Sequence, residues 1–230
     1  MRITASGGTD GASIVMFWPD NLPDDFDATF DDDPAGLVER LADEGKLIFF
    51  PCDGDGSYSV VVFVDDPLPE NLREVCEDEQ RYPILAVEGD GYFGGMEYMF
   101  KADRSFLDRY PHMCEKVAVP PGTYSATIYR TNPPDEIYDE YLERTGPAAM
   151  RVWRLHSTAA AGAIVGIFGS LISFLFLGWM QWAMVVAITL LFIVATMALS
   201  RTAGYQAVKA AQQKYERDYP SYVVDLARQE

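Results

Sequence analysis

The residue types best suited to chemistry or ligand contact gather in Gly89–Tyr98, where acids and aromatic residues alternate with glycines. Asp90 and Glu97 supply carboxylates, and Tyr92 and Tyr98 supply rings that carry hydroxyl groups. Such a loop could face a ligand or a protein partner, and Glu97 could act as a general base. The segment holds no His, Cys or Lys to complete a catalytic arrangement. A tight turn between two strands is therefore the alternative interpretation.

An acidic run lies ahead of the first helix that the sequence predicts, and its carboxylates could hold a cation or a basic partner. A run of like charges more often forms a solvated loop. The acidic patch comprises Asp24, Asp25, Asp27, Asp31, Asp32 and Asp33. A second acidic stretch, Asp53–Gly56, begins like a calcium-binding loop but has Tyr58 and Val64 where such a loop needs glycine and glutamate. It is predicted to be a turn.

Catalytic and cofactor motifs of the GxSxG, HExxH and phosphate-loop types do not occur in the sequence. Cys52, Cys76 and Cys114 are odd in number and far apart, which fits a reducing compartment rather than a disulfide framework or a zinc site. The two histidines, His112 and His156, are too few for a histidine-rich metal site. The sequence therefore predicts no catalytic residue, no metal and no cofactor.

Charge is distributed unevenly along the 230 residues, whose 35 Asp and Glu outnumber 18 Lys and Arg to give a net charge of −17. Residues 1–150 hold 31 acidic against 11 basic residues, a net charge of −20, whereas residues 151–230 hold 4 against 7, a net charge of +3. Direct nucleic-acid binding is not expected, since phosphate contacts need clustered Lys and Arg. A charge of −20 would instead attract a basic protein.

The longest uncharged stretch runs from Ser157 to Ser200, 44 residues without Asp, Glu, Lys, Arg or His. A bilayer core of about 30 Å needs about 20 helical residues, so this stretch is long enough for two spans. The break is expected at Gly178–Trp182, which combines a glycine, a glutamine and two tryptophans. The sequence therefore predicts a transmembrane hairpin with helices near 157–177 and 183–200, and a lipid bilayer as a partner.

The flanks of the two spans predict their orientation. Basic residues precede the first span and follow the second, while the connecting turn has no charge. Because Lys and Arg near span ends stay on the cytoplasmic side, both termini are expected to be cytoplasmic in a plasma or inner membrane. The expected interface anchors are Arg151, Arg154, Trp179, Trp182 and Arg201.

Small residues recur on one face of the first span, at Thr158, Gly162, Gly166 and Ser170. Such a ladder lets helix backbones approach closely. It could serve a homo-oligomer, or it could receive the second span of the same chain. Neither span contains an ionisable residue, which argues against a proton relay or an ion-coupled transporter. A pore would then have to form as an oligomer.

The first 147 residues predict an α+β domain with a mostly antiparallel sheet. Ser13–Trp18 reads as a buried strand, and Asp33-Pro34 as the start of a helix that stops near Gly45. Lys46–Cys52 and Ser57–Val64, joined by an Asp-Gly turn, predict a β-hairpin. Residues 148–200 form the juxtamembrane segment and hairpin, and the 3–4 spacing of apolar residues predicts a helical tail over 201–230 that docks on the acidic domain.

Three functions remain open from the sequence. The first is a membrane-anchored protein-interaction or regulatory module whose acidic domain binds, and thereby neutralises, a basic partner. The second is an oligomeric membrane effector that senses a ligand with its soluble domain and perturbs or gates the membrane. The third, which ranks last, is a membrane-tethered enzyme using carboxylates around Glu97.

Overall fold

The computed structural model describes residues 1–176 and 178–229. The chain forms two compact units, one made of Met1–Pro133 with Glu216–Glu230 and the other of Pro134–Tyr215. The first unit is built on a nine-stranded sheet with short helices, and the second is helical. The expected mixture of sheet and helix is confirmed, and two of the helices that follow the sheet are long and apolar.

The sheet has the strand order β3-β2-β6-β7-β1-β4-β9-β8-β5. Each neighbouring pair is antiparallel except β4 and β9, which run parallel. The strands are β1 (Arg2–Thr9), β2 (Ser13–Phe17), β3 (Leu47–Pro51), β4 (Gly56–Val64), β5 (Cys76–Val87), β6 (Gly91–Gly95), β7 (Cys114–Val117), β8 (Gly122–Thr131) and β9 (Tyr222–Arg228).

Short helices connect these strands: η1 (Pro19–Asn21), α1 (Phe26–Thr29), α2 (Pro34–Asp43), α3 (Glu70–Arg73), η2 (Met96–Tyr98) and α4 (Ser105–Arg109). The predicted start of α2 is present, because the Asp33 carboxylate accepts the Gly36 N–H at 3.1 Å and proline occupies the first turn. Gly45, with φ of +68°, ends the helix in a left-handed conformation that suits glycine.

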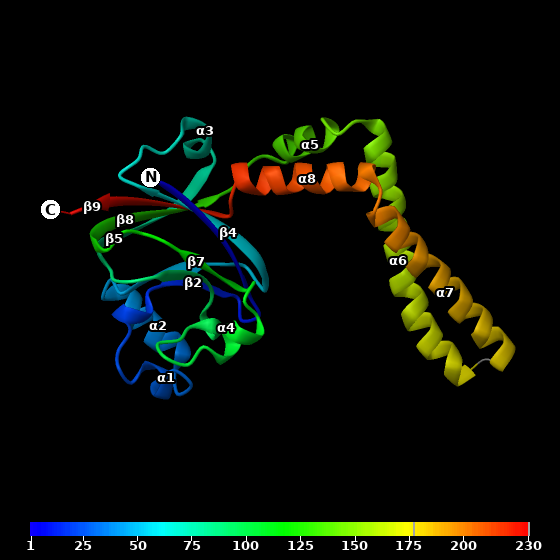
Figure 1. Ribbon diagram of the computed structural model, residues 1–230, viewed down its shortest axis with the longest axis horizontal. Coiled ribbons are helices and arrows are strands. Elements are labelled where there is room, and N and C mark those ends of the chain that lie inside the picture. The colour runs from blue at the N-terminus through cyan, green and yellow to red at the C-terminus, as the bar shows by residue number, and fades with distance from the viewer. Residues whose placement is uncertain (177, 230) are drawn as a thin grey trace. The chain divides into compact units, whose positions relative to one another are not determined.

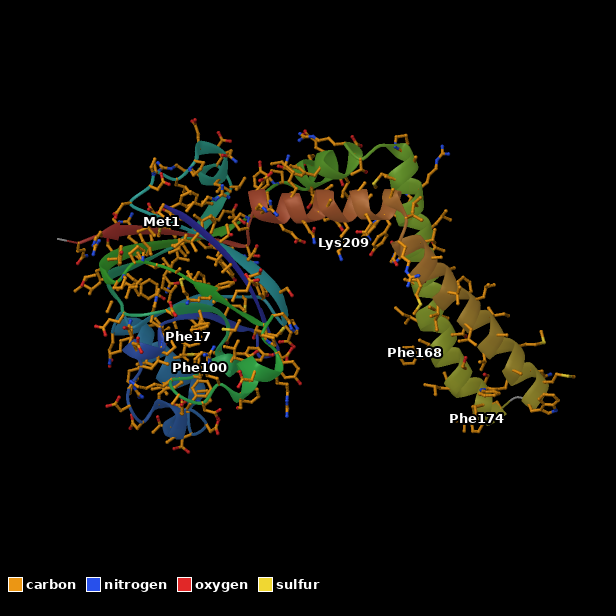
Figure 2. The ribbon with its side chains drawn as sticks, in the orientation of Figure 1. Met1, Phe17, Phe100, Phe168, Phe174 and Lys209 are labelled. Carbon is orange, nitrogen blue, oxygen red and sulfur yellow. The ribbon has the colours of Figure 1, made fainter. Side chains whose placement is uncertain are left out.

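The main core is aromatic and aliphatic, and it lies between the curled sheet and its helices. Phe17 packs edge-on against Phe100 with ring centroids 5.6 Å apart, and Phe50 packs in the same way against Phe93 at 5.4 Å (Figure 2). Trp18 is fully buried at the end of β2. The predicted buried strand at Ser13–Trp18 is therefore β2, with Trp18 following it.

The sheet curls so far that its two end strands, β3 and β5, approach each other. The Gly45 carbonyl, which precedes β3, accepts the Ala86 N–H of β5 at 2.9 Å. Asn21 adds a bridge, since its side-chain amide donates to the carbonyls of Ala86 at 2.6 Å and Lys46 at 3.5 Å. The unit is thus a nearly closed barrel whose end strands join at one end and separate toward the other.

The predicted hairpin between Lys46–Cys52 and Ser57–Val64 is wrong, although both strands exist. β3 pairs with β2, from Phe17↔Leu47 to Ser13↔Pro51, and β4 pairs along its length with β1. The Asp-Gly turn specifies only a local change of chain direction. Strand pairing was decided by β1, a Gly-rich strand that the sequence analysis did not identify.

The end of the chain also differs from the predicted helical tail. Helix α8 covers Ala203–Asp218, but Tyr222–Arg228 is strand β9, which lies between β4 and β8 (Figure 1). Tyr222 and Leu226, expected on a helical stripe, are instead buried in the sheet. The expected docking of the tail onto the acidic domain thus takes the form of strand pairing, and Glu216–Glu230 belongs to that unit.

The helical unit contains α5 (Asp135–Glu143), α6 (Pro147–Phe176), α7 (Trp179–Ser200) and most of α8. Helix α6 starts ten residues before the predicted span, since the juxtamembrane segment continues it, and α7 starts at Trp179 rather than near residue 183. Helices α6 and α7 pack side by side (Figure 1). Leu142, Ala149 and Val208 form a small core where α5, α6 and α8 meet.

Candidate functional site

Glu97, the predicted general base, holds the turn between β1 and β2. Its carboxylate accepts the Asp10 N–H at 2.6 Å and the Thr9 hydroxyl at 3.2 Å. These two hydrogen bonds to a neighbouring turn give Glu97 a structural role that requires no reaction with a substrate. Tyr98 lies beside it, and its hydroxyl donates to Asp10 at 3.3 Å. Burial, followed by the charges of Asp10 and Glu97, raises the pKa of Tyr98 to about 12, so its phenol is neutral at physiological pH.

The other two residues of the predicted loop also have structural partners. Asp90 forms an ion pair with Lys116 at 2.6 Å. The Tyr92 ring stacks on Phe17 at 5.9 Å and meets Phe100 edge-on at 5.1 Å. Asp90 therefore precedes β6, Tyr92 lies on it, and Glu97 and Tyr98 lie in η2. Each of the four has a structural partner.

The acidic patch divides into structural and solvated members. The Asp27 carboxylate accepts the backbone N–H groups of Lys101, Ala102 and Asp103 at 2.6, 2.8 and 2.8 Å. Desolvation opposes ionisation of Asp27, but these three donors outweigh it and lower its pKa. Asp24 pairs with Lys101 at 3.0 Å, and Asp33 caps α2.

The remaining members of the patch, Asp25, Asp31 and Asp32, are exposed. Within residues 1–176 and 178–229, no group of three or more His, Cys, Asp or Glu is arranged to hold a metal ion. The patch thus surrounds and includes the short helix α1 rather than forming only the predicted loop. Three of its carboxylates are bonded to neighbouring groups, and the other three are exposed to solvent.

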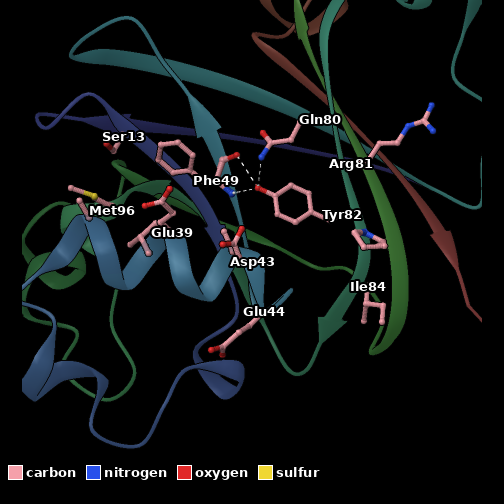
Figure 3. Close-up of a pocket in the computed structure, with 14 residues that line it drawn as sticks. Ser13, Glu39, Asp43, Glu44, Phe49, Gln80, Arg81, Tyr82, Ile84 and Met96 are labelled. Carbon is pink, nitrogen blue, oxygen red and sulfur yellow. Dashed lines mark hydrogen bonds between the residues drawn. The ribbon is translucent and has the colours of Figure 1, made fainter.

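A cavity of about 680 Å³ opens where β3 and β5 separate, and α2 forms its opposite wall (Figure 3). Its volume lies within the ~300–1,000 Å³ typical of ligand pockets. Val38 and Ala42 of α2, Phe49 of β3 and Met96 supply apolar surface. The full lining is Ser13, Ala35, Val38, Glu39, Ala42, Asp43, Glu44, Phe49, Gln80, Arg81, Tyr82, Pro83, Ile84 and Met96.

Tyr82 joins the two strands at the back of this cavity. Its hydroxyl accepts the Phe49 N–H at 3.2 Å and the Gln80 side-chain amide at 2.9 Å, and it lies 3.4 Å from the Phe49 carbonyl (Figure 3). β3 is an end strand of the sheet, and the Tyr82 hydroxyl supplies the backbone of Phe49 with the hydrogen bonds that a neighbouring strand would otherwise make. Burial raises the pKa of Tyr82, the Phe49 hydrogen bond opposes this shift, and the charge of Asp43 adds to it.

The rim of the cavity is acidic. Glu39 and Asp43 are exposed residues of α2 whose carboxylates point toward the cavity (Figure 3), and neither forms an ion pair with another described residue. Glu44 is paired with Lys46 at 2.6 Å, and this hydrogen bond and charge lower its pKa. The arrangement therefore offers two uncompensated negative charges over an apolar floor.

This cavity was missed by the sequence analysis. Its lining comes from segments between Ser13 and Met96 that touch only because the sheet curls, and such a contact has no local sequence pattern. The one available signal was the helical spacing of Glu39 and Asp43, four residues apart and so on one face of α2. That spacing alone is also the ordinary pattern of a solvated helix face.

Helices α6 and α7 are each long and apolar enough to cross a membrane. At 1.5 Å per residue, 30 residues span about 45 Å and 22 residues about 33 Å, against a hydrocarbon core of about 30 Å. Only 17% of the most apolar stretch of α6 and 6% of that of α7 are buried. Phe168 projects outward from the helix pair (Figure 2) and is 63% exposed. Phe174 is 67% exposed although its ring meets that of Trp182 in α7 edge-on, with centroids 5.7 Å apart.

The small-residue face of α6 receives α7 of the same chain. A Cβ atom added to Gly162 would lie 2.8 Å from the Phe192 ring, and one added to Gly166 would lie 2.4 Å from the Thr189 hydroxyl. The hydroxyls of Ser170 and Thr189 are 3.3 Å apart. Three of the four predicted ladder residues thus contact α7.

The fourth, Thr158, is exposed, and its hydroxyl donates to the Arg154 carbonyl at 2.9 Å within α6. Ala159 and Ala163, which the sequence analysis did not single out, are buried near this end of the helix. The packed face of α6 is therefore rotated slightly from the predicted one at its N-terminal end.

The predicted interface anchors lie at the two ends of the helix pair. Arg151, Arg154 and Arg201 are exposed. At the opposite end, Trp179 is 78% exposed, whereas Trp182 donates its indole N–H to the Ser170 carbonyl at 3.1 Å. At the arginine end, Trp153 stacks on Tyr205 with ring centroids 5.2 Å apart, and the His156 ring lies 4.3 Å from that of Tyr205.

Comparison with known proteins gives little beyond this geometry. No protein-family model matches the sequence, and no curated protein matches it. Among solved structures, a chain described as "Crocagin biosynthetic gene J" is similar at 14% sequence identity and a TM-score of 0.40, covering 57% of this chain and 79% of its own length. A TM-score of this size does not establish a shared fold.

Proposed function

We propose that this protein is a membrane-anchored interaction module, in which helices α6 and α7 hold an acidic sheet unit at the bilayer and that unit binds a basic protein. The proposal rests on one observation: the charged residues and the exposed apolar residues lie in different parts of the chain. The sheet unit concentrates negative charge, whereas the helix pair is uncharged over 44 residues and exposes its apolar side chains.

The charge of the sheet unit is largely uncompensated. Met1–Pro133 and Glu216–Glu230 hold 30 acidic and 12 basic residues, a net charge of −18. Ion pairs engage Asp24, Glu44, Asp53, Asp66, Glu79 and Asp90, which are a minority of these acids. A surface of this kind accelerates encounter with a basic protein and disfavours acidic ones.

The membrane hairpin is proposed to act as an anchor with both termini cytoplasmic. Arg151, Arg154 and Arg201 stand at the end of the hairpin that leads to the rest of the chain, which is the side where basic flanks are retained. The small-residue face is filled by α7, so an oligomeric pore through that face would require α7 to leave it. An anchor therefore agrees better with the packing than a pore does.

Topology can be tested by replacing Gln181, at the turn of the hairpin, with cysteine in a chain whose three native cysteines are changed to serine. Labelling of intact cells with a membrane-impermeant maleimide should reach Gln181→Cys from outside, and a cysteine at Gln229 should react only after lysis. Labelling of the turn from the cytoplasmic side would refute the hairpin.

Partner binding can be tested with a photo-cross-linking amino acid at Ile84, which is 59% exposed. The cross-linked protein is identified, purified and titrated against the full chain in nanodiscs at about 0.05 and 0.5 M salt. We expect a basic partner whose affinity falls more than about tenfold over that range. An acidic partner, or an affinity that ignores salt, would refute electrostatic capture.

A further inference from the structure

We propose that the cavity between α2, β3 and β5 binds a lysine or arginine side chain presented by an extended segment of the basic partner. This inference rests on the proposed function and names the place and the chemistry of recognition. It is carried by the cavity and by the charges that line it, not by the acidic patch.

The charges on the rim leave a net attraction for a cation. Glu44 is neutralised by Lys46, and Arg81 is paired with Glu79 while its side chain points away from α2 (Figure 3). Glu39 and Asp43 remain without an ion pair among the described residues. An ammonium or guanidinium group placed between them would form charge-assisted hydrogen bonds, which are stronger than neutral ones.

The floor of the cavity suits the hydrocarbon stem of such a side chain. Val38 and Ala42 are buried, and Phe49 and Met96 are half-buried, so together they offer an apolar surface beneath the carboxylates. Lysine and arginine bury their methylene groups against apolar surface while their charged ends stay with polar partners. The Phe49 ring adds a face that could attract the cation directly.

The size and rim of the cavity favour a peptide segment over a free amine. A volume of about 680 Å³ is of the size that accommodates a drug-sized ligand, so a single small amine would leave most of it unfilled. Pro83 and Ile84 are exposed at the rim and can contact apolar residues next to the inserted cation. The cavity also opens between two strand edges, a place where extended peptides bind in other proteins.

The test uses the full chain in nanodiscs and a pentapeptide with acetyl and amide ends, valine at four positions and lysine at the centre, titrated by calorimetry. The pocket variant is Glu39→Gln with Asp43→Asn, and the matched control is Asp31→Asn with Asp32→Asn, which removes the same charge from the acidic patch. We expect about tenfold weaker binding for the pocket variant and less than about twofold for the control.

Several results would overturn the inference. Equal losses in both variants would mean diffuse attraction, and equal binding of a peptide with acetylated lysine would exclude recognition of the cation. Binding of n-butylamine as tightly as the peptide would make this a site for free amines. Thermal unfolding and far-ultraviolet circular dichroism of both variants check that the exposed substitutions leave the fold intact.

The two proposals fail in different ways. If the cross-linked basic partner binds the pocket variant as tightly as the original chain, the pocket is not its docking site, but electrostatic capture stands. If the partner proves acidic or neutral, the proposed function fails whatever the peptide shows.

Discussion

Two glycines on the same helix provide a controlled test of how α6 packs on α7. A Cβ atom at Gly166 would lie 2.4 Å from the Thr189 hydroxyl and 3.1 Å from the Thr189 Cβ, whereas a Cβ atom at Gly169 would meet nothing within 4 Å. The substitutions Gly166→Ala and Gly169→Ala make the same chemical change, three residues apart. They differ only in what the new methyl group contacts.

The expected magnitudes follow from two opposing terms. Replacing glycine by alanine within a helix stabilises it by about 1 kcal/mol, and both variants gain this. Overpacking a close contact costs about 1–3 kcal/mol, and only Gly166→Ala incurs it. Thr189 has little freedom to move aside, because it is 5% exposed and its hydroxyl donates to the Val185 carbonyl at 2.8 Å. The two variants should therefore differ by about 1–3 kcal/mol, with Gly169→Ala the more stable.

The free energy of unfolding can be measured in mixed micelles by titrating a denaturing detergent and following the distance between fluorophores at the two ends of the hairpin. Gly166→Ala should unfold at a lower detergent fraction than Gly169→Ala, and Gly169→Ala at a higher fraction than the original chain. Equal midpoints for the two variants would refute the contact between Gly166 and Thr189, and with it the assignment of the small-residue face to α7. A concentration-dependent midpoint would instead indicate that this face binds a second copy.

Three further changes test the sheet unit. Asp33→Ala removes the cap of α2 and should lower the free energy of unfolding by about 1 kcal/mol, as measured by urea titration. The folded-state pKa of Asp27 lies below its ordinary value of 3.8, so its contribution to stability is complete above that value and is lost as the pH falls through the lower folded pKa. Asp27→Asn should therefore weaken the acid dependence of the thermal midpoint, and an unchanged dependence would contradict the bonds to its carboxylate. Gly45→Ala places a methyl group 2.1 Å from the Ile84 carbonyl at φ of +68°, and should unfold at a markedly lower temperature than the unobstructed control Gly54→Ala.

Elements with a strong local pattern were predictable, and their partners were not. The start of α2 could be predicted because Asp33-Pro34 is a capping signal. Two long apolar helices could be predicted because 44 consecutive residues carry no charge. The pairing of β3 with β4 was mispredicted because β4 pairs with β1 instead, and an Asp-Gly turn does not reveal this competitor. Even the nearest pair of the β1–β4 ladder, Thr9 and Gly56, is separated by 47 residues in the sequence. Strand pairing of this kind depends on burial across long sequence separations.

The candidate site shows the same limit. Glu97 and Asp27, the acids predicted to act on a substrate or bind a ligand, instead accept hydrogen bonds from backbone N–H groups. Backbone N–H groups that have no partner in a helix or sheet need an acceptor, and a nearby carboxylate provides one. The cavity instead uses Glu39 and Asp43, whose surroundings are created by the curl of the sheet. Only Met96 links the predicted loop to the cavity that the fold provides.

The path of the chain couples the two units more closely than a domain followed by an anchor would. The helical unit, residues 134–215, is inserted between β8 and β9, which are neighbours in the sheet. Strand β9 pairs with β4 on one side and β8 on the other, and buries Tyr222, Val223 and Leu226. Removing everything after residue 150 would take away the internal strand β9 as well as α7 and most of α6. The backbone groups of β4 and β8 that pair with β9 would then lack partners. The sheet that carries the cavity is therefore complete only after α6, α7 and α8 have been synthesised, because β9 follows them in the chain.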